Sequence, residues 1–332
     1  MAVLVTGAAG FIGAATSRAL LERGDEVVGI DNLNDYYDPK LKDARLKNLQ
    51  QQFGNRFRFE CVDFADADLL RGFTDTIDFD RIAHLGAQAG VRYSLKNPQA
   101  YVQSNLVGHC NMLELARTRQ AKHMVYASSS SVYGGNKSLP FRVEDRVDHP
   151  LSLYAATKKA DELLSESYAS LYRLALTGLR FFTVYGPWGR PDMAMWIFVK
   201  ALYGGEPLPL FNGGEMRRDF TYVDDIVRGV VACLDGPPRD DGQMKAGGST
   251  SPHAVYNIGN SRSEDLMRVV ELLERETGRK ALLNPMPMQV GDVPETFADI
   301  SAIERDHGFE PATSIDEGVP RFVKWYRDYH GL

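Results

Sequence analysis

The sequence is poor in cysteine, and it has no long apolar run. Its three cysteines, Cys61, Cys110 and Cys233, lie far apart and form no Cys-x-x-Cys pair. This argues against a disulfide framework or a zinc site and favours a reducing compartment. No apolar stretch reaches the roughly 18 residues of a membrane span, and the first residues carry no basic segment typical of a signal peptide. We therefore expect a cytoplasmic protein that does not act in a membrane.

An excess of positive charge is also missing. The 332 residues carry a formal net charge of -6, so bulk charge attracts neither nucleic acid nor anionic lipid. Hydrophobic residues make up 44% and charged residues 25% of the chain, as in ordinary globular proteins. The length suits one large domain or two unequal domains. The composition therefore predicts a globular protein without a nucleic-acid partner.

A glycine-rich segment, residues 7–13, follows a short buried strand. Gly7 permits a tight turn, Gly10 lets the backbone approach a pyrophosphate, and Gly13 lets helix and strand pack closely. The helix that begins here offers free N–H groups and the positive end of its dipole to phosphates. The next strand ends at Asp31, whose carboxylate can bind an adenosine ribose and would repel a 2′-phosphate. This order of elements predicts binding of NAD rather than NADP.

Strands and helices continue to alternate up to about residue 186, which predicts an α/β fold with a doubly wound parallel sheet. We expect its later strands at residues 56–62, 81–85, 123–127 and 177–182, and its long helices at 98–118 and 154–172. After Pro187, glycine, proline and methionine become frequent, which indicates a second, smaller domain. The expected division is a Rossmann domain over 1–186, to which about 215–235 and 254–278 return, and a substrate domain over 187–214 and 279–332.

Two polar residues in the first domain leave two interpretations open. Asp63 closes the third strand, where it could hold an adenine amino group or serve as an ordinary turn acid. Asn105 lies in an otherwise apolar helix and needs a partner, which is either a backbone group or the cofactor. The small residues 86–90, after the fourth strand, would let a dinucleotide lie across the strand ends.

Four consecutive serines, residues 128–131, follow the apolar fifth strand. Ligands of open α/β sheets bind at the carboxyl ends of the strands. We therefore interpret these serines as part of a binding site rather than as a solvated turn.

Tyr154 and Lys158 begin the helix that follows. Residues four apart share a helix face, so a phenol and an ammonium would lie side by side. The cation favours phenolate over phenol, which suits a general base. The same spacing also arises by chance on exposed helices, so this interpretation depends on the rest of the chain.

Taken together, the glycines of 7–13, the segment 128–134 and Tyr154-x-x-x-Lys158 resemble the extended short-chain dehydrogenase/reductase family, the NAD-dependent epimerases and dehydratases of nucleotide sugars. The resemblance covers nearly the whole chain. The stretches most similar to its subgroup of UDP-glucuronate 4-epimerases are residues 86–94, 186–194 and 291–296. The resemblance implies tightly held NAD and a homodimer packed through the helices at about 98–118 and 154–173.

Carried over residue by residue, the resemblance implies Ser129, Tyr154 and Lys158 as catalytic residues. The expected cofactor-binding residues are Gly7, Gly10, Phe11, Ile12, Gly13, Asp31, Asn32, Asp63, Phe64, Leu85, Gly86, Ala87, Gln88, Asn105, Ser128, Tyr154, Lys158 and Phe181. The expected substrate-binding residues are Ser129, Ser130, Ser131, Thr183, Arg190, Arg218 and Asp292. The chain departs from UDP-galactose epimerases at Gln289, where those enzymes commonly have a second diphosphate-binding arginine; Arg190 could supply that contact.

The activity implied is C4 epimerisation of a UDP-sugar. Tyr154 would take the proton of the 4-hydroxyl while the C4 hydride passes to NAD, and the 4-keto sugar would rotate before the hydride returns to its other face. Dehydratases of the family carry Asp-Glu, and decarboxylases carry Glu, directly before Val-Tyr-Gly, where this chain has Ser130 and Ser131. Because no acid stands there to donate a proton, we expect epimerisation rather than elimination.

The same serines bear on the substrate. The hydroxyl groups of Ser130, Ser131 and Thr183 could bind a sugar 6-carboxylate, which an Asp or Glu would repel. This favours UDP-glucuronate over UDP-glucose. The alternatives are a UDP-glucose 4-epimerase, a UDP-glucuronate decarboxylase and a regulator that senses NAD without catalysis.

Overall fold

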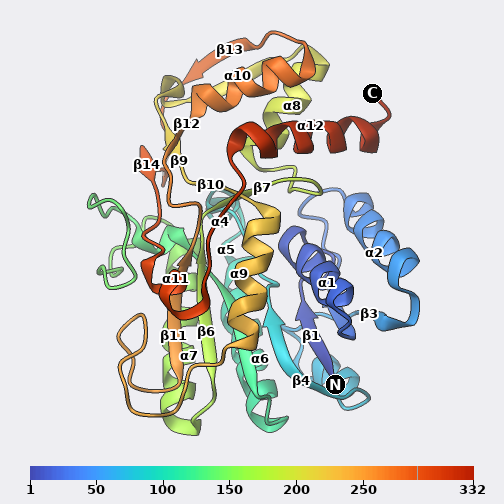
Figure 1. Ribbon diagram of the computed structural model, residues 1–332, viewed down its shortest axis with the longest axis vertical. Helices are drawn as coiled ribbons and strands as arrows, with labels where there is room; N and C mark the ends of the chain where they lie inside the picture. Colours follow the sequence, from blue (N-terminus) through green and yellow to red (C-terminus); the bar gives the residue numbers. More distant parts are fainter. Residues whose placement is uncertain (290) are drawn as a thin grey trace.

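The computed structural model describes residues 1–289 and 291–332, which form a parallel sheet of seven strands with helices on both faces (Figure 1). The strand order is β11-β6-β5-β4-β1-β2-β3, and each neighbouring pair is parallel. The strands are β1 (Ala2–Thr6), β2 (Val27–Asp31), β3 (Phe57–Cys61), β4 (Phe79–His84), β5 (His123–Ser129), β6 (Leu176–Phe181) and β11 (His253–Ile258). This architecture confirms the predicted doubly wound α/β fold.

Helices cover both faces of this sheet. They are α1 (Phe11–Arg23), α2 (Pro39–Phe53), α3 (Ala67–Thr74), α6 (Gly108–Thr118), α7 (Leu153–Tyr172), α9 (Val223–Asp235) and α11 (Ser301–His307). In β1, Val3 and Val5 lie in a hydrophobic cluster with side chains of α1 and α9, whereas Leu4 lies in a cluster with side chains of α6. Successive side chains of a strand point to opposite faces, so covering both faces buries every residue of β1.

β1 also marks the point where the strand order reverses. The chain runs from β1 to β2 and β3 on one side, and to β4, β5 and β6 on the other. In open sheets the ligand crevice lies outside the carboxyl ends of the strands at such a point. The glycine segment after β1 and the serines at the end of β5 therefore reach the same edge of the sheet.

The long helix predicted over residues 98–118 is interrupted. The structure has α4 (Val91–Lys96), α5 (Pro98–Tyr101), a π-helical turn over Val102–Val107, and then α6. A π-helical turn inserts an extra residue and commonly marks a functional site. Here the turn contains Asn105, whose partners are described below.

The elements beyond the sheet form a second group, drawn at the top of Figure 1. They are β7 (Thr183–Tyr185), α8 (Ala194–Gly204), β8 (Pro207–Phe211), β9 (Arg217–Arg218), β10 (Phe220–Tyr222), β12 (Glu264–Asp265), α10 (Leu266–Thr277), β13 (Leu282–Met286), β14 (Glu295–Thr296) and α12 (Ile315–His330). Side chains of α8, α10 and α12 share a separate hydrophobic cluster.

The domain boundaries expected from the sequence stay a prediction, but two helices differ from it in their packing. We expected the segment of α10 in the first domain and that of α11 in the second. In the structure α10 lies in the cluster with α8 and α12, whereas Ile303 of α11 lies in the cluster of the main sheet.

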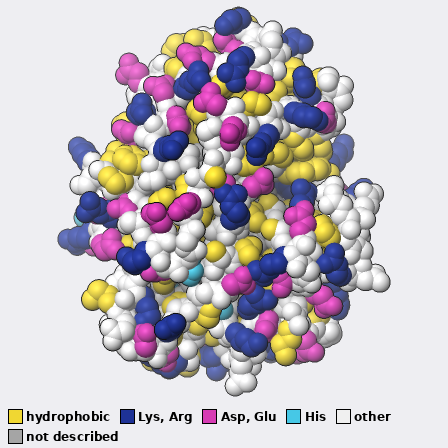
Figure 2. Space-filling model, viewed as in Figure 1, with side chains coloured by type: hydrophobic (Ala, Val, Ile, Leu, Met, Phe, Trp, Pro, Cys, Tyr) yellow, Lys and Arg dark blue, Asp and Glu magenta, His cyan; other side chains and the backbone are white. Residues whose placement is uncertain are grey.

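Acidic and basic side chains are interspersed over the face of the molecule shown in Figure 2. None of the helices in the described part of the chain combines the length and the apolar character that crossing a membrane requires.

Candidate active site

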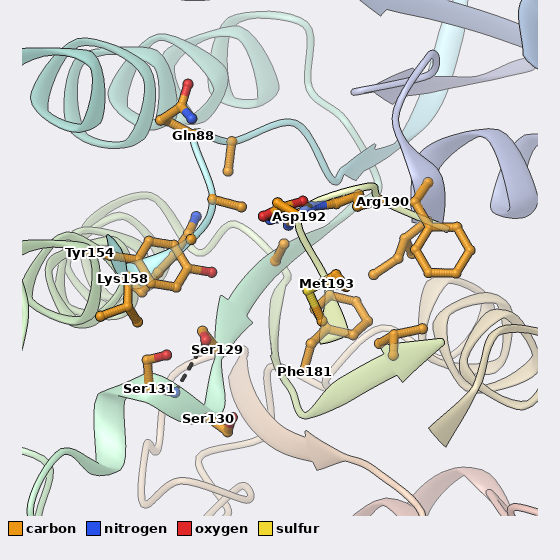
Figure 3. Close-up of a pocket in the computed structure, with 18 of the residues that line it drawn as sticks. Gln88, Ser129, Ser130, Ser131, Tyr154, Lys158, Phe181, Arg190, Asp192 and Met193 are labelled. Atoms are coloured by element: carbon orange, nitrogen blue, oxygen red, sulfur yellow. Dashed lines mark hydrogen bonds and ion pairs between the residues drawn. The ribbon is translucent and has the colours of Figure 1, made fainter. Parts of the chain in front are cut away.

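A cavity of about 480 Å³ opens at the carboxyl ends of the sheet strands (Figure 3). It brings together most of the residues that the sequence analysis selected. Those that line it are Gly7, Gly10, Phe11, Ile12, Gly13, Asp31, Asn32, Phe64, Leu85, Gly86, Ala87, Gln88, Ser128, Ser129, Ser130, Ser131, Tyr154, Lys158, Phe181, Thr183, Arg190, Arg218 and Asp292. Gln289 lines it as well. The lining residues come from both groups of elements, so the cavity lies where the two groups meet.

The glycine segment forms one wall of the cavity. Gly7 has φ +67, and a Cβ atom on it would lie 2.7 Å from the Cα atom of Gly86. A Cβ atom on Gly13 would lie only 2.0 Å from the carbonyl oxygen of Gly7. Because the N-cap residue of α1 is Gly10, no side chain competes for the N–H groups of the first helical turn. This cradle fits the diphosphate of a dinucleotide.

The carboxylate of Asp31 stands at the end of β2, next to that cradle. The side chain is buried, and it accepts a hydrogen bond from the backbone N–H of Leu33 at 2.9 Å. Burial raises the pKa of the Asp31 carboxyl, and the ammonium of Lys42, 3.9 Å away, opposes this effect. The sequence analysis did not select Lys42. Its position on the apolar face of a helix was a signal that could have identified it.

Asp63 and Asn105 are not among the residues that line the cavity. Asp63 accepts hydrogen bonds from the side chain of Asn32 at 3.0 Å and from the backbone N–H of Ala65 at 2.9 Å, as a turn acid does, and its contact with adenine stays a prediction.

Asn105 accepts a hydrogen bond from the backbone N–H of Gln88 and donates to its carbonyl oxygen, at 2.9 and 3.0 Å. It also donates to the hydroxyl of Thr157 at 3.0 Å. Backbone groups and a threonine are therefore its partners, and through them it ties the segment after β4 to α7.

Tyr154 lies in the first turn of α7, which is capped by Ser152. Its phenol points into the cavity towards the serine segment (Figure 3). The ring packs edge-on against Tyr101, with ring centroids 5.9 Å apart. The hydroxyl of Tyr101 in turn donates to the carbonyl oxygens of Ala89, at 2.9 Å, and Gly90. The orientation of Tyr154 is thus supported by a buried aromatic side chain that is itself fixed to the backbone.

In Figure 3, Ser129 and Ser131 lie on the side of the cavity towards Tyr154, and Ser130 lies farther from it. The Ser129 hydroxyl accepts a hydrogen bond from the backbone N–H of Ser131 at 3.1 Å, which begins a short 3₁₀ turn. In this turn, hydroxyl groups of consecutive residues line one wall of the cavity.

A buried ion pair holds the serine segment against α7. Arg180 of β6 donates to both carboxylate oxygens of Glu162, at 2.8 and 3.0 Å, and the hydroxyl of Ser128 donates to Glu162 at 2.7 Å. Burial raises the pKa of Glu162, but the guanidinium of Arg180 outweighs it, and the pKa is lowered overall. Sequence reasoning missed this pair because its members lie on separate elements.

Lys158 lies one turn after Tyr154, on the same face of α7, and it lines the cavity. Its ammonium donates to Asp161 Oδ2 at 3.0 Å. Sequence reasoning also missed Asp161, although its spacing of three from Lys158 on a helix was a usable signal.

Arg190 does not lie free in the cavity. It pairs with both oxygens of Asp192, at 3.0 and 2.5 Å, and the hydroxyl of Tyr36 donates to the same carboxylate at 3.1 Å. These contacts join the loop after β2 to the loop after β7. The sequence analysis selected neither Tyr36 nor Asp192.

Arg218 also lines the cavity. It donates to the carbonyl oxygen of Pro294 at 3.0 Å, and its guanidinium is 4.0 Å from Asp292. Burial lowers the pKa of Arg218, while Asp292 opposes this effect. A cation in such surroundings gains from an anionic ligand.

Known proteins are similar to this chain over nearly its whole length. The model of the NAD dependent epimerase/dehydratase family matches residues 3–259. A protein of Rhizobium meliloti named probable UDP-glucuronate 4-epimerase is 47% identical over 98% of this chain and 97% of its own length. UDP-glucuronate 4-epimerase 6 of Arabidopsis thaliana is 48% identical over 100% of this chain and 73% of its own length.

A solved structure agrees with these matches. The UDP-glucuronic acid 4-epimerase of Bacillus cereus, in complex with UDP-glucuronic acid and NAD, superimposes with a TM-score of 0.88 at 34% identity, covering 99% of this chain and 100% of that one. Family model, relatives and structure therefore agree that this chain is a member of the NAD dependent epimerase/dehydratase family.

Proposed function

We propose that this protein is a nucleotide-sugar isomerase that converts UDP-glucuronate to UDP-galacturonate by inversion at C4, with NAD as its cofactor. The observation that carries the proposal is the row of hydroxyl groups at Ser129, Ser130 and Ser131, which lines the same cavity as Tyr154 and the glycine cradle. The similarity to epimerases whose names include UDP-glucuronate, and to a structure with UDP-glucuronic acid and NAD, supports the same conclusion.

The cradle at Gly7, Gly10 and Gly13 would hold the diphosphate of NAD, and Asp31 would accept hydrogen bonds from its adenosine ribose. When bound, NAD supplies the redox chemistry by accepting a hydride at its nicotinamide and giving it back. Because the carboxylate of Asp31 would repel a 2′-phosphate, we expect NADP to bind poorly.

Tyr154 acts as the base that takes the proton of the sugar 4-hydroxyl and later returns it. The ammonium of Lys158, one helical turn away, favours the phenolate form. The hydroxyl of Ser129 donates a hydrogen bond to the reacting oxygen. No proton is consumed in the full cycle, because the one that Tyr154 removes is the one that it returns.

The remaining residues recognise the substrate. Arg218 would bind the diphosphate and Asp292 the uridine ribose. Arg190 would give the second diphosphate contact, in place of an arginine at position 289. Hydroxyl groups of Ser130, Ser131 and Thr183 would donate hydrogen bonds to the 6-carboxylate, where an acidic side chain would repel it.

We also propose that the enzyme works in the cytoplasm as a homodimer. The three cysteines in the described residues are all free, which suits a reducing compartment. Apolar side chains are exposed on the helices expected to form the dimer interface, and a second copy would cover them. These side chains are Val107, Leu163, Leu171 and Tyr172. Sedimentation equilibrium tests the dimer, and a monomer at micromolar concentration would contradict it.

An NMR assay of sugar products tests the proposed reaction. Purified protein with NAD should convert UDP-glucuronate to its C4 epimer and should turn over UDP-glucose much more slowly. Equal or faster turnover of UDP-glucose would make it a UDP-glucose 4-epimerase. Release of carbon dioxide with a UDP-pentose product would make it a decarboxylase, and no turnover of either sugar would favour a regulator that senses NAD.

A further inference from the structure

Behind Tyr154, the structure places a carboxylate to which the reaction described above assigns no role. Asp161 lies on α7, and its Oδ2 atom accepts a hydrogen bond from the ammonium of Lys158 at 3.0 Å. The side chains of Lys158 and Asp161 are only 4% and 1% exposed. Among the described residues, the other carboxylate oxygen of Asp161 has no hydrogen-bond partner.

An ion pair in which one carboxylate oxygen lacks a partner is expected to contribute little to the net stability of the fold. A buried carboxylate costs free energy unless its remaining lone pairs also find donors, and a neutral residue in its place often costs less. The geometry therefore points to an electrostatic role for Asp161. That role depends on which other charges lie around Lys158.

The titratable groups packed next to Lys158 and Asp161 are either neutral or paired with a group of opposite type. His84 of β4 and His109 of α6 are neutral, because burial first and the charge of Lys158 second lower the pKa of His84 to about 3, and burial lowers that of His109 far below its usual value. On β5, Tyr126 is neutral because burial raises its pKa. On β11, His253 faces Glu166, with 2.8 Å between Nδ1 and the carboxylate.

The remaining charges behind the site are one carboxylate and two cations. The carboxylate of Glu162, which follows Asp161 in the chain, is neutralised by the guanidinium of Arg180. Lys159 lies 3.3 Å from Glu162 and is partly exposed to solvent. Because solvent screens the partly exposed Lys159, the charge beneath Tyr154 is set mainly by Lys158 and Asp161. Lys158 lies nearer to Tyr154 along the helix, so the ionised carboxylate of Asp161 offsets the effect of Lys158 on Tyr154 only in part.

We propose that Asp161 is a positioning residue that holds the ammonium of Lys158 and, by offsetting part of its charge, tunes the pH at which Tyr154 loses its proton. The inference rests on the proposed role of Tyr154 as the base. Asp161 follows Tyr154 by seven residues, or about 10 Å along the helix axis. A unit charge at that distance, in an effective dielectric of about 20, shifts a titration midpoint by about one pH unit.

The state of Asp161 itself depends on pH. Burial raises the pKa of its carboxyl to about 6, although Lys158 opposes the shift. Below that pH the carboxyl takes up a proton, and the charge of Lys158 is no longer offset. The effect of Asp161 on Tyr154 should therefore be present at neutral pH and disappear in acid.

The test is the variant Asp161→Asn in the NAD-loaded protein, which keeps the size of the side chain and removes its charge. Tyrosinate absorbance, with the Tyr154→Phe protein as background, should show Tyr154 ionising about one pH unit lower than in the wild type. Above about pH 6, where Asp161 is ionised, the acidic limb of kcat/KM should move by the same amount. At about pH 5, where Asp161 is mostly protonated, the two proteins should behave alike.

Glu166→Gln is the matched control. It removes the same charge from the same helix, but its carboxylate is 41% exposed and lies more than a turn further on. We expect no shift in that variant. If Asp161→Asn does not fold, Asp161→Ser replaces it in the test. That variant also removes the charge, has a smaller side chain, and should show the same shift.

An unchanged or higher midpoint in a folded, NAD-binding Asp161 variant would overturn the proposal, and so would an equal shift in Glu166→Gln. The absorbance titration is made without sugar. It therefore decides the role of Asp161 even where the wild type proves inactive on UDP-glucuronate and the proposed function fails.

Discussion

The substitution Gly13→Ala should abolish tight NAD binding, and the structure gives the reason as a distance. The added Cβ atom would lie 2.0 Å from the carbonyl oxygen of Gly7, whereas ordinary contacts begin at 3.4 Å. The helix and the loop would therefore have to separate by about 1.4 Å, in an interior packed as tightly as an organic crystal. The loop has little room to retreat, because a Cβ on Gly7 would already lie 2.7 Å from Gly86 on its other side.

A displacement of this size moves the glycine loop away from the N–H groups at the start of α1, with which it forms the diphosphate cradle. Misplacement by about 1 Å costs on the order of 100-fold in a positioned site, so we expect NAD affinity to fall at least about 100-fold. Overpacking should also lower the free energy of unfolding by about 1–3 kcal/mol. Isothermal titration of the NAD-free protein measures the first effect, and urea unfolding without NAD measures the second.

Gly72→Ala is the matched control for this experiment. Gly72 lies inside α3, and a Cβ atom there would meet none of the described atoms within 4 Å. Alanine should leave NAD affinity unchanged and raise stability by about 0.5–1 kcal/mol. If Gly13→Ala bound NAD within a few-fold of the wild type, the close contact between α1 and the glycine loop could not be what shapes the site.

Three further variants test other parts of the site. Tyr154→Phe should reduce turnover at least about 1000-fold while NAD stays bound, and substantial epimerisation by that protein would remove Tyr154 from its role. Glu162→Gln leaves the buried Arg180 without its partner and should cost about 3–5 kcal/mol in urea unfolding. Because the pKa of Glu162 is lowered by folding, its contribution is present above its unfolded pKa, and the deficit of the variant should shrink as pH falls through the folded pKa. Ser131→Glu should raise KM for UDP-glucuronate through repulsion of the 6-carboxylate, and an unchanged KM would place that carboxylate elsewhere.

The sequence predicted the parts of the site that depend on local order. Residues 7–13 and Asp31 lie within one strand–loop–helix–strand unit, where each residue's position follows from its neighbours. The serines of 128–131 could be placed because the carboxyl ends of parallel strands meet at one edge of a sheet. The prediction that Tyr154 and Lys158 share a face required only the 3.6-residue repeat of a helix.

Contacts between distant segments could not be predicted in this way. The hydrogen bond from Tyr36 to Asp192 spans 156 positions, and the contact of Arg180 with Glu162 joins a strand to a helix. No local pattern specifies which acid meets which base across the fold. Arg190 was selected as a substitute for the arginine absent at position 289, and its bidentate contact with Asp192 became visible only in the structure.

Asn105 shows a second limit of the sequence. Its apolar surroundings correctly indicated that it needs a partner, but the continuous helix expected there is broken by a π-helical turn. That turn carries the side chain to the backbone of Gln88 and to Thr157. A hydrophobic pattern with a period of 3.6 residues does not reveal one extra residue in a turn.

The central claim is that Tyr154 exchanges one proton with the sugar while the hydrogen on C4 does not exchange with solvent. UDP-glucuronate labelled with deuterium at C4 tests it most directly, with the product analysed by NMR. The account predicts a C4 epimer that keeps the deuterium on C4 in ordinary water. Loss of the label to solvent, or inversion without any dependence on Tyr154, would contradict it.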